Sequence, residues 1–207
     1  MAVLPYCVIV AALKIEKPSV GVDGKRVESL DLETLRLYYS EFADSALGTD
    51  TFRLSALEFH RVIATVFRQT AVVPFRFPNV LKTREELESH LRTNLKKYQS
   101  FLEKTRDAVQ MEVAPSTAGP SPGSETGGSG TEYLRQKQQR SRAFTDLFNL
   151  VMNKAGELIL NSKTGDSRLY LLVPRNGTDD LRKRLSELQE IRISGPWPAS
   201  EFLETTS

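Results

Sequence analysis

Alternating and helical periods of hydrophobic residues follow one another along the chain, and this pattern predicts a mixed α+β protein. Tyr6–Leu13 is a continuous apolar run and is expected to form a buried first strand. Leu35–Phe42 alternates apolar and polar side chains, as a half-exposed strand does. Ala71–Phe77 (AVVPFRF) is short, β-branched and aromatic, which predicts another buried strand. Its guanidinium, that of Arg76, needs a partner there because a buried unpaired charge is costly.

Two capping boxes predict where helices begin. Ser55–Glu58 (SALE) places one helix start at Ser55. Apolar residues then recur at helical spacing and form one wide face; they are Phe59, Val62, Ile63, Val66 and Phe67. Thr83–Glu86 (TREE) predicts the start of a single long helix that ends near Arg106, with leucines on one face and charged residues on the other.

The second half of the chain predicts the element order of a ferredoxin-like sandwich. The expected elements are a strand at Ala108–Val113, a helix over residues 131–155, strands at Leu158–Asn161 and Arg168–Val173, a short helix capped by Thr178, and a strand at Glu190–Ser194 followed by a turn at Gly195–Pro198. Residues 114–130 are rich in Pro, Gly and Ser, so they are predicted to form a flexible loop. We therefore expect an N-terminal α+β domain over residues 1–106 and a C-terminal ferredoxin-like (βαββαβ) domain over residues 107–207, with this long loop after its first strand.

Composition and charge exclude several classes of protein. The net charge of +2 leaves no broad basic field for non-specific nucleic-acid binding. The single cysteine, Cys7, cannot form an intrachain disulfide, and no apolar run reaches the roughly 18 residues of a membrane span. Ala2–Leu13 has the length of a signal-peptide core, but no Lys or Arg precedes it and it contains Pro5 and Tyr6, which favours a strand. The expected location is the cytoplasm.

Signatures of catalysis and metal binding are missing from the sequence. His60 and His90 have no cysteine partner and no HExxH spacing, so no metal site is expected. There is no Gly-x-Ser-x-Gly elbow, and the Gly-rich stretch lacks the Gly-Lys-Ser/Thr ending that cradles phosphate. Cys7 lies in an apolar strand, where a thiol usually packs without reacting. We predict that the protein is not an enzyme and has no cofactor.

A basic run and the predicted sheet leave two binding interpretations open. Arg135, Lys137, Arg140 and Arg142 lie in an otherwise polar helix start, which is either a solvated face or a docking site for an acidic partner surface. A ferredoxin-like sheet is also a possible RNA platform, but this needs outward aromatic residues beside basic ones, and the strands of the second half offer little besides Tyr170.

Three stretches in a fixed order carry a family resemblance. They are Glu58–His60 leading into Val72–Phe77, the helix from Thr83 that ends in Val109–Val113 before a variable loop and Tyr133-Leu134, and Leu169–Pro174 with Ile193–Pro198 and Phe202. On these motifs, among which Pro-x-Arg-Phe and Gly-Pro-Trp-Pro are fairly specific, the chain resembles the gas vesicle protein F/L (GvpF/GvpL) family over nearly its whole length.

The resemblance implies a non-enzymatic protein of gas vesicle formation with a modified ferredoxin fold in its C-terminal domain. Its implied partners are the small hydrophobic shell protein and other gas vesicle accessory proteins, and its implied location is the cytoplasm and the gas vesicle. The open alternative is a ferredoxin-like ligand- or nucleic-acid-binding module without a vesicle role. A partner of the shell protein needs an adhesive surface and no reactive group, because apolar surface that is exposed before assembly aggregates.

The candidate partner-binding residues are Arg135, Lys137, Arg140, Arg142, Trp197 and Phe202. Trp and Arg are the residue types most often found as interface anchors, although a tryptophan in this position is also typical of a packed C-terminal clamp. The remaining motif residues are expected to be structural; they are Pro74, Arg76, Phe77, Gly195, Pro196 and Pro198.

Overall fold

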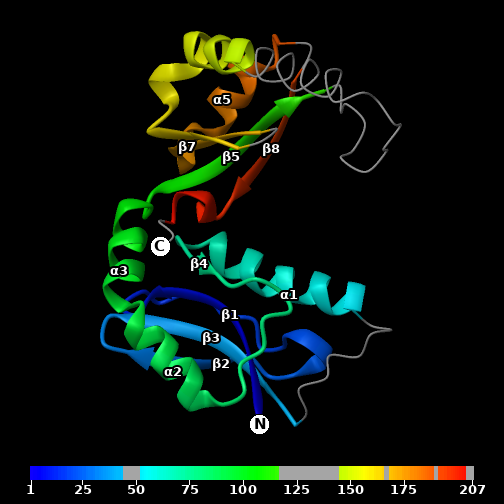
Figure 1. The fold of residues 1–207 in the computed structure, drawn as a ribbon, viewed down its shortest axis with the longest axis vertical. Coiled ribbons are helices and arrows are strands. Elements are labelled where there is room, and N and C mark those ends of the chain that lie inside the picture. Colours follow the sequence, from blue (N-terminus) through cyan, green and yellow to red (C-terminus); the bar gives the residue numbers. More distant parts are fainter. Residues whose placement is uncertain (44–51, 117–144, 166–167, 189–190, 204–207) are drawn as a thin grey trace, which may run out of the picture. The chain divides into compact units, whose positions relative to one another are not determined.

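The computed structural model describes residues 1–43, 52–116, 145–165, 168–188 and 191–203 (Figure 1). The fold is mixed α+β, with two four-stranded sheets. The chain forms two compact units, one of Met1–Ala108 together with the segment that begins at Pro198, and one of Val109–Trp197. The segment from Pro198 was expected in the second domain, whereas in the structure it groups with the first unit.

The first sheet is built around β1 (Ala2–Val10), which lies between β3 (Leu35–Phe42) and the short β4 (Val73–Pro74). β2 (Glu28–Leu32) forms the other edge, and β1 with β3, β1 with β4 and β2 with β3 all pair antiparallel. Every β1 residue from Ala2 to Ile9 is buried, which explains why the sequence of this strand is continuously apolar and not alternating. The expected first strand is confirmed, although it begins and ends a few residues earlier than Tyr6–Leu13.

Helices cover both faces of this sheet (Figure 1). On one face, the leucines of β2 and β3 lie under α2 (Arg84–Thr93) and α3 (Leu95–Lys104). On the other face, α1 (Phe52–Phe67) packs against β1, and the ring of its Phe59 lies 5.2 Å from that of Tyr6. The expectation that β3 is half-exposed is therefore wrong, because Tyr38 and Ser40 on its second face are also buried.

Two of the helix boundaries differ from the sequence prediction. α1 begins at Phe52, so Ser55 lies inside the helix, where its buried hydroxyl donates to Asp23 Oδ1 at 3.0 Å instead of capping. The predicted single helix to Arg106 is broken at Asn94, whose side-chain amide donates at 2.9 Å to the His90 carbonyl, which also accepts from the Asn94 N–H at 3.2 Å. The capping box at Thr83 is confirmed, since the Thr83 hydroxyl accepts from the Glu86 N–H at 3.2 Å.

The second sheet has the strand order β6-β7-β5-β8. Its elements are β5 (Ala108–Pro115), a helix over residues 145–155, β6 (Asn161–Thr164), β7 (Leu169–Pro174), α5 (Thr178–Leu185) and β8 (Ile191–Trp197). β5 pairs with β8 and β6 pairs with β7, both antiparallel. Ala114 and Pro115 belong to β5, and residues 117–144, which include most of the predicted loop and the start of the predicted helix, lie outside the described residues.

Three further boundaries in the second unit correct the prediction. Leu158 lies in a 3₁₀ turn and β6 begins only at Asn161. Thr178 is the first residue of α5, and no side-chain capping bond is present at this helix start. The last strand does not end at Ser194 but continues through Gly195 to Trp197, so the predicted turn is largely a strand.

One buried hydrogen-bond network holds the loop between β1 and β2 onto the sheet. The Tyr6 hydroxyl donates to Ser40 Oγ at 2.9 Å and accepts from the Val22 N–H at 3.0 Å. Ser40 Oγ in turn donates to the Arg26 carbonyl at 2.8 Å. A Cβ at Gly21 would lie 2.1 Å from the Tyr6 oxygen, so only glycine lets the loop approach this closely. Burial raises the pKa of Tyr6, which keeps the hydroxyl protonated as a donor.

Tyr6→Phe is expected to lower the free energy of unfolding by about 1–3 kcal/mol, because it leaves the Val22 N–H and the Ser40 hydroxyl buried and unsatisfied. Urea denaturation of the full chain measures the loss. Tyr39→Phe is the matched control, since Tyr39 is buried to a similar degree and its hydroxyl makes no hydrogen bond within the part of the chain that the structure describes. Equal losses in the two variants would contradict the network's importance.

Candidate functional site

Two titratable residues singled out in the sequence, His90 and Cys7, are packed against other side chains of the first unit. His90 Nε2 lies 2.9 Å from the Tyr98 hydroxyl, and its ring is 5.4 Å from that of Phe75. Burial, together with the charge of Lys97, lowers the pKa of His90, which favours a neutral ring. Burial alone raises the pKa of the Cys7 thiol, so this side chain is protonated and inaccessible. In the described part of the chain, no three His, Cys, Asp or Glu side chains gather where they could hold a metal ion.

The Pro-x-Arg-Phe motif lies where the chain leaves the edge of β1. Beyond β4, the Phe75 N–H donates to the Tyr6 carbonyl at 2.9 Å, and the pairing resumes only between Leu81 and Val3. The chain from Phe75 to Leu81 is longer than the stretch of β1 that it faces, so the excess is extruded as a turn. The Asn79 N–H closes this turn by donating to the Arg76 carbonyl at 2.9 Å, and we call Arg76–Asn79 the Arg76 turn.

Arg76 is therefore exposed, and the expectation of a buried strand with a satisfied ion pair is wrong at this residue. The strand itself is confined to Val73–Pro74, with Pro74 half-buried opposite Cys7. Arg76, Phe77, Pro78 and Asn79 line a shallow, open depression. A depression of this kind suits a protein surface better than a small molecule, which needs a concave pocket.

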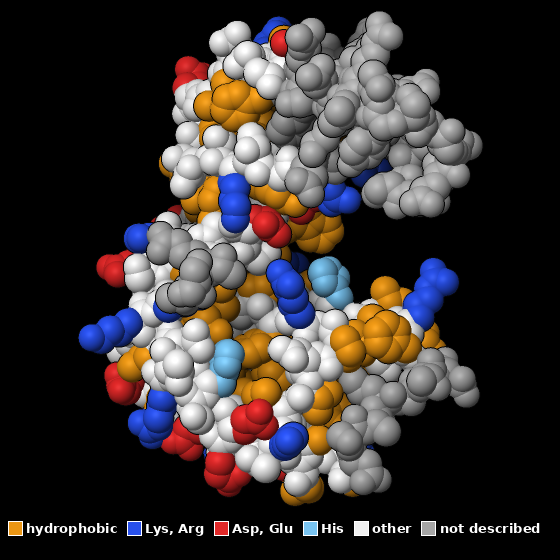
Figure 2. Space-filling model, viewed as in Figure 1, with side chains coloured by type: hydrophobic (Ala, Val, Ile, Leu, Met, Phe, Trp, Pro, Cys, Tyr) orange, Lys and Arg blue, Asp and Glu red, His pale blue; other side chains and the backbone are white. Residues whose placement is uncertain are grey.

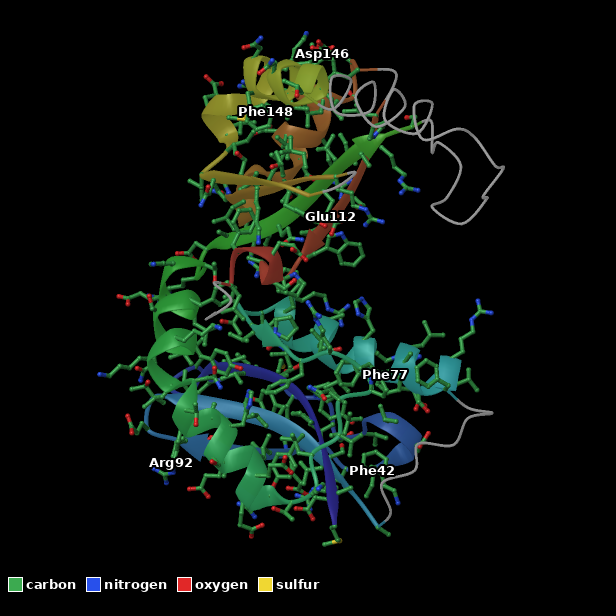
Figure 3. All side chains as sticks on the ribbon, viewed as in Figure 1. Phe42, Phe77, Arg92, Glu112, Asp146 and Phe148 are labelled. Carbon is green, nitrogen blue, oxygen red and sulfur yellow. The ribbon has the colours of Figure 1, made fainter. Side chains whose placement is uncertain are left out.

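Phe77 joins the turn to α1 through an aromatic cluster (Figure 3). Its ring centroid lies 5.1 Å from that of Phe52 and 5.3 Å from that of Phe59, in tilted geometries. Phe59 is buried and Phe77 is half-buried, while Phe52 at the start of α1 is 47% exposed. The cluster thus anchors the turn from inside and continues to the surface.

The Gly-Pro-Trp-Pro motif of the second unit includes the end of β8. Gly195 has a φ of +115°, and a Cβ there would lie 2.8 Å from the Gln110 carbonyl oxygen and 2.9 Å from Met111 Sδ. The Arg182 guanidinium of α5 donates to the Gly195 carbonyl, which fixes the strand end to the helix. The backbone conformation at Gly195 and its close neighbours therefore leave no room for a side chain at this position.

Trp197 and Phe202, the predicted aromatic anchors, lie in different units. Trp197 pairs with Gln110 at the end of β8 and is 37% exposed. Phe202 is half-buried in the 3₁₀ turn Ser200–Phe202, and Pro198 precedes this turn in the first unit. The predicted basic residues Arg135, Lys137, Arg140 and Arg142 lie outside the described residues.

The outward face of α1 was not among the sites predicted from the sequence. Leu54 and Leu57 are 64% and 58% exposed, which is unusual for leucines in a helix that already buries one apolar face. The signal is in the sequence, because Leu54 and Leu57 are three residues apart and therefore share a face opposite the buried Phe59 and Ile63. This face cannot be recognised when the helix is started at Ser55, because Phe52 and Leu54 are then placed in the preceding loop.

These observations define a mixed α+β protein whose described surface offers aromatic, aliphatic and arginine side chains. No helix among the described residues is both long and apolar enough to cross a membrane. The family model of gas vesicle synthesis protein GvpL/GvpF matches residues 2–204, and the chain therefore belongs to this family.

Solved structures of gas vesicle proteins have the same fold. The crystal structure of gas vesicle protein GvpF from Anabaena sp. PCC7120 has a TM-score of 0.73 at 14% identity, and the match covers 100% of this chain and 97% of that one. The crystal structure of GvpF from Microcystis aeruginosa has a TM-score of 0.71 at 13% identity and covers 98% of each chain. No curated protein matches the sequence.

Arg76→Ala is expected to change the free energy of unfolding by less than about 0.5 kcal/mol, because the side chain is exposed. Phe77→Ala is its matched partner in the same turn and should cost about 1.5–3 kcal/mol through the lost ring contacts. Chemical denaturation of both variants measures the difference. A loss above about 1.5 kcal/mol for Arg76→Ala would reinstate a buried ion pair.

Gly195→Ala is expected to destabilise the protein by about 2 kcal/mol or more, because alanine is strained at this positive φ and its Cβ collides with backbone. Gly156→Ala is the control from the same unit, since a Cβ there meets only the end of the Met152 side chain at 3.9 Å. Thermal or urea unfolding distinguishes them, and a neutral Gly195→Ala would show that β8 does not need this conformation.

Proposed function

We propose that this protein is an accessory or minor structural protein of gas vesicles that binds the hydrophobic shell protein and supports vesicle assembly. The observation that carries the proposal is the family match over residues 2–204. In this proposal, the protein acts in the cytoplasm and at the gas vesicle, has other vesicle accessory proteins as further partners, and uses no catalytic group or cofactor.

The exposed side chains of both units support an adhesive function. In the first unit, Phe52 continues an aromatic cluster to the surface beside the Arg76 turn. In the second unit, the side chain of Trp197 at the end of β8 is 37% exposed. Apolar side chains at a surface favour association with another apolar surface, because both are then removed from water. The proposed contacts are Trp197, Phe202 and the basic residues Arg135, Lys137, Arg140 and Arg142.

The proposed architecture is an N-terminal α+β domain and a C-terminal ferredoxin-like domain, divided near residues 106–107. The strand order β6-β7-β5-β8 supports this assignment, since numbering the four strands within the unit gives the order 2-3-1-4 of a split βαβ sheet. The helix over residues 145–155 and α5 occupy the two crossover positions of that fold. The two compact units are consistent with such a division, apart from the segment that begins at Pro198.

Co-expression with a major gas vesicle shell protein tests the proposal. The expected result is that the shell protein stays in the soluble fraction and co-purifies with the tagged full chain, because the chain covers apolar surface that otherwise aggregates. Mass spectrometry and absorbance at 260 nm identify what is recovered. Recovery of nucleic acid or a small ligand without shell protein would overturn the proposal in favour of a ligand-binding module.

Trp197→Ser refines the same assay. It is expected to reduce the recovered shell protein at least about fivefold, as loss of an interface anchor does. Leu160→Ser is the matched control, because it removes an even more exposed apolar side chain from the same unit. Equal recovery with both variants would remove Trp197 from the contact surface and leave the binding itself intact.

A further inference from the structure

The outward face of α1 combines apolar and cationic side chains in one line. Leu54, Leu57, Arg61 and Arg68 are spaced i, i+3, i+7 and i+14, so they fall on one side of the helix and its immediate extension. All four are exposed, and we call them the α1 stripe. At about 1.5 Å per residue the α1 stripe is about 21 Å long, which is the length of a surface helix. Figure 2 shows hydrophobic and cationic side chains exposed together where α1 begins.

The arginines of the α1 stripe have no carboxylate partner among the described residues. The ion pairs formed among the described residues include those of Arg26, Arg36, Arg92, Lys154, Arg168 and Arg184, and none of these six involves Arg61 or Arg68. Within the described part of the chain, the Arg68 guanidinium donates to the Thr65 hydroxyl, at 3.2 Å, and to no carboxylate. The single acidic residue of α1, Glu58, is engaged elsewhere, because its carboxylate accepts from the Asp23 N–H at 2.9 Å. Arg53 is exposed beside the α1 stripe and adds a further positive charge.

Charge and shape together select one kind of partner. We propose that the α1 stripe docks an amphipathic helix whose apolar side is bordered by carboxylates. Residues at i, i+3 and i+7 form a ridge that fits the groove of a second helix, with Leu54 and Leu57 as the apolar contact. Arg61 and Arg68 lie further along the ridge, where carboxylates of the partner form bidentate pairs with them. The two leucines alone bury too little area for stable binding, so the ion pairs set the specificity.

Two synthetic helical peptides of about 18 residues test the proposal with the full chain. Both carry the same leucine face, which is bordered by Glu in one peptide and by Lys in the other. Fluorescence anisotropy is expected to show binding of the Glu peptide that is at least about tenfold tighter than that of the Lys peptide and weakens with salt. Equal affinity for both peptides, or no binding of either, would overturn the proposal.

Variants locate the binding on α1. Arg61→Glu with Arg68→Glu, and separately Leu54→Ser with Leu57→Ser, are each expected to raise the Kd of the Glu peptide at least about tenfold. Lys96→Glu with Lys104→Glu on α3 is the matched control, since both lysines are exposed in the same unit and the charge change is identical; its Kd should stay within about twofold. An equal effect of the control would show that only net charge matters, and would contradict a docking site.

Other occupants of the α1 stripe give different results. Binding of the chain to vesicles of phosphatidylglycerol that is abolished by Arg61→Glu with Arg68→Glu, without binding of the Glu peptide, would overturn the proposal in favour of a membrane surface. Self-association that is lost in the same variant would assign the face to a second copy of the chain. The peptide assay contains no shell protein, so its outcome is independent of the co-expression experiment.

Discussion

The burial of β1 on both faces is the constraint on which the first unit depends. A strand without a solvent face carries no polar side chain that needs water, so Ala2–Ile9 is apolar apart from the Tyr6 hydroxyl and the Cys7 thiol. The hydroxyl is satisfied within the protein by Ser40 and Val22. Because both faces must be covered, α1 is needed on one side and the α2–α3 pair on the other, and each helix can bury only one of its own faces.

That constraint also decides where the protein can make contacts. α1 buries Phe59, Val62 and Val66 on the side that covers β1, and its opposite face is exposed to solvent. Phe75 bonds to Tyr6 and Leu81 bonds to Val3, so the segment Phe75–Leu81 has more residues than the part of β1 that it faces. The excess forms the Arg76 turn beside the start of α1. The same covering layer that buries the sheet thus presents aromatic, aliphatic and arginine side chains outward.

The likeness to two GvpF crystal structures at 13–14% identity shows how loosely individual residues determine this fold. A period of two in strands and 3.6 in helices can be kept by many different apolar residues, so the layers persist while the surface residues change. Positions with a special backbone conformation are less free. Gly195 is one, because its positive φ and its contact with Met111 and the Gln110 carbonyl exclude a side chain.

The sequence by itself determined the elements whose signal is local: the continuous apolar run of β1, the buried face of α1, the cap at Thr83, and the family through its spaced motifs. Tertiary structure decided what depends on distant partners. Ser55 became a buried donor to Asp23 and not a cap, because the loop after β1 reaches it. Arg76 became exposed, because the register on β1 and not the β-propensity of its neighbours sets its position. Local periodicity indicates which face of an element is apolar. Which residues are extruded to the surface depends on how well paired segments match in length, and only the folded sheet defines that match.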